Sequence, residues 1–175
     1  MSVNREVLSV YKPGDKIVYG IHGVCEILEV VTRIIDRRKR DFYVLQPIGQ
    51  TADRFFVPTD NAAALAKMHT LLSRDDIENL FNMNVDLDGI WISDDNQRKQ
   101  RYRELISSGD RKVLVYLIKV LHIHRAKQQA QGRKFHISDE NFLRDALKLL
   151  SSEISYVLNI SQPEATEYLK GKLLD

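Results

Sequence analysis

The sequence predicts an α+β protein, in which a small antiparallel β barrel of Tudor or SH3 type precedes an all-α domain. In the first third of the chain, four or five short β-branched and aromatic runs are separated by close turns. In the remainder, apolar residues recur at helical spacing. A chain of 175 residues is long enough for two such modules, which we place at residues 1–65 and 66–175.

The strands are expected first within residues 12–31, which read KPGDKIVYGIHGVCEILEVV. Pro13 fixes a turn, and strands follow at about 16–20 and 24–35. Between them lie Gly20 and Gly23, because glycine permits the corner of a curved sheet. Residues 36–41 are expected to form a charged hairpin tip. Further strands follow at 42–47 and 54–58, each stopped by a proline.

The helices begin where alanine and leucine become dominant, at residues 62–72. Ser73 and the acidic residues after it are typical of a helix N-terminus, ahead of an apolar run at 77–81. Residues 82–95 are expected to form a loop. Later helices are predicted at 96–107, ending near Gly109, at 111–131, at 138–158, and after Ser161.

Composition narrows the range of functions. A hydrophobic fraction of 43%, with 29% charged residues, is ordinary for a globular protein, and the net charge of +2 does not by itself indicate a nucleic-acid binder. A single cysteine, Cys25, excludes an intrachain disulfide and suits a reducing compartment. We find no signal-peptide pattern and no apolar run near the ~20 residues that span a bilayer, so we expect a cytoplasmic protein.

Residues 14–30, GDKIVYGIHGVCEILEV, resemble the opening of the CarD/CdnL family of bacterial RNA polymerase-binding transcription regulators. A similar module occurs in the polymerase-interacting domain of transcription-repair coupling factors. Two later segments also resemble the family, namely the turn Ser108-Gly109-Asp110 and the segment LNISQPEATEYL at 158–169. The resemblance therefore extends over most of the chain.

The resemblance implies that the β module pairs an edge strand with the RNA polymerase β subunit. Arg33 matches a contact arginine of the family, whereas Phe56 stands where the family has a second arginine. Arg54, two residues earlier, is a candidate replacement. The alternative is that Arg33 and Arg54 are only solvated strand positions. The basic tip at 37–40 is likewise either a solvated turn or a contact for an acidic partner.

The helical half holds a local excess of basic residues, because only Glu104 and Asp110 oppose the cations between residues 98 and 134. Clustered Lys and Arg favour phosphate contacts, although a solvated helix face has the same composition. The candidates for DNA contact are Arg98, Lys99, Arg101 and Arg103.

Trp91 is the only tryptophan. The resemblance implies that such a residue wedges into the minor groove of promoter DNA near the −10 element. Trp91 lies about four residues farther from the Ser-Gly-Asp turn than the family pattern has it. A buried loop anchor is therefore the alternative. The acidic residues at 139–140 also depart from the basic patch that the family has there.

We therefore expect a transcription regulator that binds the polymerase β subunit and promoter DNA and stabilises the open promoter complex. A protein-interaction adaptor without direct DNA binding is the alternative. No cofactor or metal site and no catalytic constellation is predicted, because the histidines lack partners at ligand spacing. A monomer associated with the nucleoid through RNA polymerase, and not with a membrane, is expected.

Overall fold

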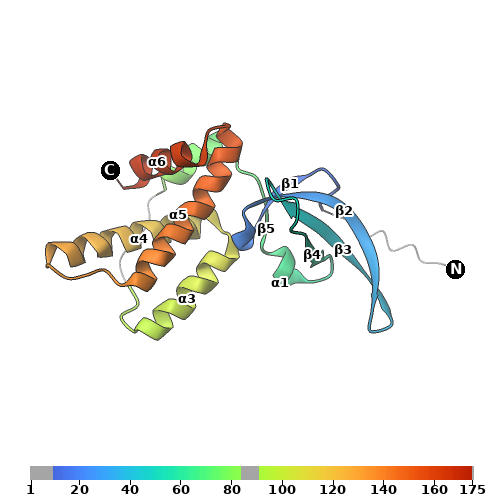
Figure 1. The fold of residues 1–175 in the computed structure, drawn as a ribbon, viewed down its shortest axis with the longest axis horizontal. Helices are drawn as coiled ribbons and strands as arrows, with labels where there is room; N and C mark the ends of the chain where they lie inside the picture. The colour runs from blue at the N-terminus through green and yellow to red at the C-terminus, as the bar shows by residue number, and fades with distance from the viewer. Residues whose placement is uncertain (1–9, 84–90, 175) are drawn as a thin grey trace.

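The computed structural model describes residues 10–83 and 91–174 and confirms the expected fold class. An N-terminal antiparallel sheet is followed by a helical domain, and the two lie beside each other (Figure 1). The β2–β3 hairpin extends from the sheet on the side away from the helices (Figure 1). No helix within the described residues is long and apolar enough to cross a bilayer.

The sheet has five strands in the order β4-β3-β2-β1-β5, and each neighbouring pair is antiparallel. The strands are β1 (Lys16–Tyr19), β2 (Val24–Ile35), β3 (Arg38–Pro47), β4 (Phe55–Pro58) and β5 (Met68–Thr70). A short 3-10 helix, η1 (Gly20–His22), makes the glycine corner between β1 and β2. The register of β2 against β3 shifts between Ile27 and Glu29, and such a bulge bends the strand.

The hairpin tip is tighter than the sequence suggests. Asp36 and Arg37 both have positive φ, 51° and 62°, which is the geometry of a two-residue hairpin turn. Ile35 pairs directly with Arg38 across this turn. Three of the four basic residues expected in the loop, Arg38, Lys39 and Arg40, are therefore the first residues of β3, where side chains alternate between the two faces of the sheet.

The segment at 62–72 forms less helix than its alanine content suggests. Helix α1 (Ala62–Leu65) has a single turn, and the chain then returns to the sheet as β5, in which Met68 pairs with Tyr19. Asn61 caps α1 by accepting a hydrogen bond from the backbone of Ala64. The sheet therefore extends to Thr70, beyond the expected boundary at residue 65.

The longer helices begin and end close to their sequence signals. They are α2 (Arg74–Phe81), α3 (Asp95–Ser108), α4 (Arg111–Ala130), α5 (Ile137–Leu158) and α6 (Gln162–Leu173). Ser73 and Ser161 each form a capping box, and Gly109 ends α3 in the left-handed conformation. Residues 84–90 of the expected loop at 82–95 lie outside the described residues.

Each module has its own apolar core. The sheet encloses a cluster made of Ile17, Cys25, Ile27, Tyr43, Leu45, Val57 and Met68. A larger cluster is built from α2 to α6, with Leu117, Leu121, Leu143 and Ile154 among its fully buried members. Burying such side chains contributes about 1.5–3 kcal/mol each. The two modules therefore have separate apolar cores.

Candidate functional site

The first candidate surface lies on the β module and centres on Arg33 and Phe56. Val44 of β3 pairs with Glu29 of β2 on one side and with Phe56 of β4 on the other, so these side chains lie on one face of the sheet. Arg33 lies four residues beyond Glu29 on β2 and therefore points to the same face. The guanidinium carbon of Arg33 lies 3.8 Å from the centroid of the Phe56 ring. Phe56 is 39% exposed, which is high for a phenylalanine in a strand. The two residues therefore form one exposed cation–π patch.

An open strand edge adjoins this patch. Among the residues that the structure describes, β4 pairs only with β3, so its other side has no strand neighbour. The opposite edge strand, β5, is directed toward the helical domain, where Arg111 donates a hydrogen bond to the carbonyl of Thr70. Arg54 is exposed and lies immediately before β4, rather than on the strand itself. Phe56 thus lies on the free edge strand and Arg54 immediately before it, whereas Arg33 lies on β2 and reaches this edge through its contact with Phe56.

The second candidate surface includes Trp91, which is held against the helical domain. Its ring stacks on the imidazole of His124, with centroids 3.3 Å apart and an interplanar angle of 12°. The guanidinium carbon of Arg98 lies 4.5 Å from the indole centroid. Trp91 also packs against the helical core and is half-buried. In this structure Trp91 therefore anchors the start of α3 to α4.

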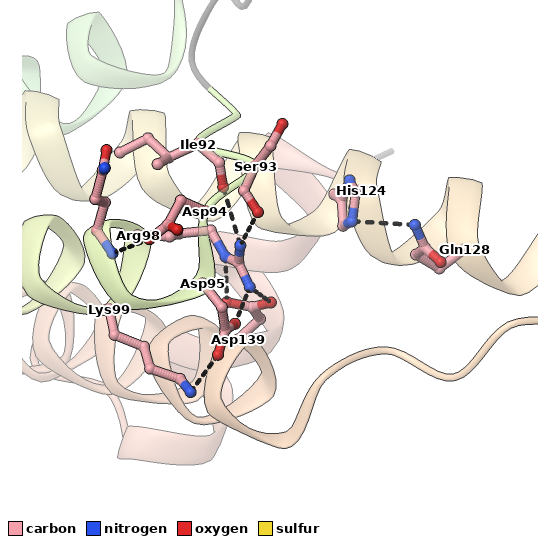
Figure 2. Close-up of polar contacts among 10 residues, drawn as sticks. Ile92, Ser93, Asp94, Asp95, Arg98, Lys99, His124, Gln128 and Asp139 are labelled. Carbon is pink, nitrogen blue, oxygen red and sulfur yellow. Dashed lines mark hydrogen bonds and ion pairs between the residues drawn. The ribbon is translucent and has the colours of Figure 1, made fainter.

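The sequence does not predict a contact between His124 and Trp91. No local pattern indicates it, because 33 positions separate the two residues. Gln128 lies one turn further along α4 and hydrogen-bonds His124 at 3.2 Å (Figure 2). Burial lowers the pKa of His124, and the nearby Asp139 carboxylate opposes this shift. The lowered pKa of His124 favours the neutral form of the imidazole that stacks on the indole.

Arg98 differs from the expectation that it faces DNA. Arg98 is 2% exposed, and its Nε and one terminal nitrogen each donate a hydrogen bond to the Asp139 carboxylate at 3.0 Å (Figure 2). The other terminal nitrogen donates to the carbonyl of Ile92 at 2.9 Å. Burial alone would lower the pKa of Arg98, but the hydrogen bonds and charge of Asp139 raise it. All three guanidinium nitrogens of Arg98 therefore donate hydrogen bonds within the protein.

Asp139 explains the acidic start of α5 that the sequence left unexplained. Asp139 is 0% exposed, so its carboxylate pairs with Arg98 inside the protein and is not accessible at the surface. A charge-assisted bidentate pair of this kind fixes the orientation of both partners. Asp139 therefore fastens α5 to α3 at the position where Trp91 lies.

Lys99, Arg101 and Arg103 differ in what they offer to a partner. Lys99 is half-buried and pairs with Asp95, whose pKa is lowered chiefly by that hydrogen bond. Arg101 is exposed and lies 3.4 Å from Glu104. Arg103 is exposed, and within the described residues no ion pair engages it. Lys99 and Arg103 lie four residues apart on one flank of α3, whereas Arg101 lies on the other flank.

Further unpaired cations lie along α4 and in the segment after it. Lys112, Lys119, Lys127, Arg133 and Lys134 have no ion-pair partner in the part of the chain that the structure describes. Within residues 10–83 and 91–174, no group of three or more His, Cys, Asp or Glu side chains is placed to hold a metal ion. The helical module thus offers cations for a polyanion.

Two family models match the chain. Residues 11–69 match the CarD-like/TRCF RID domain, and residues 91–170 match the CarD C-terminal domain. The first match ends within β5. A search of curated proteins found no significant match.

Proposed function

The chain belongs to the CarD family of RNA polymerase-interacting transcription regulators, and on this premise we propose that it joins the polymerase β subunit to promoter DNA. The β module binds the β subunit, and the helical module contacts DNA and stabilises the open promoter complex. The protein acts by binding and not by catalysis. Because it binds the open promoter complex better than the closed one, it raises the population of the open complex.

The observation that carries the polymerase contact is the Arg33–Phe56 pair beside the open edge of β4. An exposed strand edge presents free N–H and C=O groups that a strand of a partner can pair with. Arg33 adds a charge that orients the partner, and Phe56 keeps this guanidinium in place. A cation–π contact at an exposed site contributes about 0.5–1 kcal/mol.

Purified β subunit and the full-length protein test this contact by biolayer interferometry. We expect Arg33→Glu and Phe56→Ala to weaken binding, the first more strongly because it also reverses a charge. Lys39→Glu is the matched control, because Lys39 is an exposed cation on the same hairpin without an ion-pair partner among the described residues. Equal loss in the control and in Arg33→Glu would show that only net charge matters.

The proposed DNA surface combines Lys99, Arg101 and Arg103 of α3 with the unpaired cations of α4. In this surface Arg98 supports Trp91 instead of contacting phosphate. For Trp91 to act as the wedge, its indole must exchange the imidazole of His124 for a DNA base, which also offers a flat π face. The stack with His124 therefore opposes insertion.

A salt titration tests the DNA contact. Phosphate contacts give a slope of about −0.9 per neutralised phosphate in a plot of log K against log salt. Replacing Lys99, Arg101 and Arg103 with alanine should make the slope less steep by about 2–3. Replacing Arg37, Arg38 and Lys39, three cations of the β module, should leave it unchanged.

A second function is favoured by the same geometry, namely an adaptor whose helical module binds protein. Trp91 and Arg98, two of the five expected DNA contacts, are already engaged inside the protein. In that case the full-length protein binds polymerase, but promoter DNA alone is bound weakly and with no slope difference between the two triple variants.

A further inference from the structure

The two modules meet through backbone that is packed unusually closely. Gly20, at the corner between β1 and β2, lies against Gly109, which ends α3. A Cβ on Gly109 would lie 3.2 Å from the Cα of Gly20, and a Cβ on Gly20 would lie 3.2 Å from the carbonyl oxygen of Ser107. Both glycines have positive φ, so side chains are disfavoured by conformation as well as by space.

A buried carboxylate forms a second contact between the modules. Glu153 of α5 is 2% exposed, and its Oε1 accepts a hydrogen bond from the backbone N–H of Leu72 at 2.9 Å. Arg111, at the start of α4, donates to both oxygens of Glu153 at 2.7 and 2.8 Å. The same guanidinium donates to the carbonyl of Thr70 in β5. One ion pair therefore holds the end of the sheet, its linker, α4 and α5.

A third contact completes the junction. Nε2 of His69, the middle residue of β5, lies 2.9 Å from the carbonyl oxygen of Ser108. The turn Ser108-Gly109-Asp110 thus contacts the β module through two successive residues, while Asp110 caps α4 by accepting hydrogen bonds from Lys112 and Val113. These bonds leave the backbone between the modules little freedom.

We infer that Glu153, Arg111 and the Gly20–Gly109 contact form an interdomain latch that holds the two modules as one rigid body. Glu153 is the positioning residue of this latch, because its carboxylate contacts both the linker backbone and Arg111. The latch fixes the distance between the Arg33–Phe56 patch and the proposed DNA surface on α3 and α4. This inference rests on the proposed function. The distance sets where the helical module meets DNA when the β module is bound to the polymerase.

The direct test measures the distance between the modules in the free full-length protein. Spin labels on cysteines placed at Thr51 and Gln129, both exposed, report one position in each module by double electron–electron resonance. Cys25 is fully buried and stays unlabelled in the folded protein. We expect one narrow distance distribution, and at least a doubling of its width in Glu153→Gln, which removes the charge and keeps the size.

Glu167→Gln is the matched control, because Glu167 pairs with Lys170 on the surface of α6 with its side chain 74% exposed. Its distribution should equal that of the parent protein. If Glu153→Gln does not fold, Arg111→Lys takes its place, since lysine keeps the charge but cannot hold both Glu153 and Thr70. An unchanged narrow distribution in the folded variant, or a broad one in the parent protein, would overturn the latch.

A second readout separates the latch from the proposed function. Glu153→Gln should bind the polymerase β subunit within twofold of the parent protein, because the Arg33–Phe56 patch is untouched. Its ability to prolong the life of open complexes should fall to near the value without the protein. If the parent protein binds no polymerase, the proposed function fails while the distance measurement still decides the latch.

Discussion

The pair between Arg98 and Asp139 gives the sharpest energetic prediction. Their side chains are 3% and 0% exposed, so either charge left alone is buried. Removing one partner of a buried pair costs about 3–5 kcal/mol of folding free energy. Asp139→Ala should fall at the lower end of this range, because Arg98 keeps Asp95 and the carbonyl of Ile92 as partners. Arg98→Ala should fall at the upper end.

The assay is urea unfolding followed by far-UV circular dichroism, with the fluorescence of Trp91 as a second probe. Trp91 is the only tryptophan, so its emission reports directly on the indole beside Arg98 and His124. Arg98→Ala should shift native emission to the red as this contact is lost, whereas Asp139→Ala should shift it less.

The control is Arg101→Ala, which removes an exposed pair with Glu104 whose side chains are 57% and 54% exposed. Such surface pairs contribute about 0–1 kcal/mol. A double variant with apolar residues, Arg98→Met with Asp139→Leu, should be more stable than either single alanine variant. If both single variants cost less than about 1 kcal/mol, the assignment of this pair as a structural anchor would be refuted.

Three further predictions concern stability. Gly109→Ala should cost more than Gly132→Ala in thermal unfolding, because both glycines have a φ of 67° but only Gly109 lies against Gly20; equal costs would show that the close approach is unimportant. Tyr102→Phe should leave stability unchanged or raise it, because the buried hydroxyl has no hydrogen-bond partner among the described residues; a loss above about 1 kcal/mol would indicate one. Burial raises the pKa of the Cys25 thiol from 9.0 to about 11. The unfolded chain therefore loses this proton first, and stability should fall as pH rises from about 9 to about 11 by an amount that is absent in Cys25→Ala.

Much of the fold could be predicted because its signals are local. Prolines 47 and 58 end strands, and Ser73, Ser161 and Gly109 mark helix ends through backbone hydrogen bonds made within a few residues. Strand β5 could not be found in this way. Its three residues follow an alanine-rich turn, and their place is set by pairing with β1, about fifty positions earlier.

The candidate site was less predictable for the same physical reason. Arg98 lies in a helix so rich in charge that each cation looks solvated, and its partner Asp139 is 41 positions away. Arg111 and Glu153 are 42 positions apart, so their ion pair could not be predicted from the sequence either. The fourteen positions between Asp139 and Glu153 place both carboxylates on one face of α5, about 21 Å apart. Only the packing of α5 against α3 and α4 shows that this face is inside.

The most direct test of the proposed polymerase contact is the affinity of the full-length protein for the RNA polymerase β subunit, compared with that of Arg33→Glu. We predict specific binding by the parent protein, a loss of at least tenfold in Arg33→Glu, and a change within twofold in the control Lys39→Glu. A tenfold loss corresponds to about 1.4 kcal/mol, within reach of one charge reversal at an interface. Binding that is equally strong in all three proteins would contradict the placement of the docking surface at the Arg33–Phe56 patch, and no binding by the parent protein would contradict the proposed β-subunit contact itself.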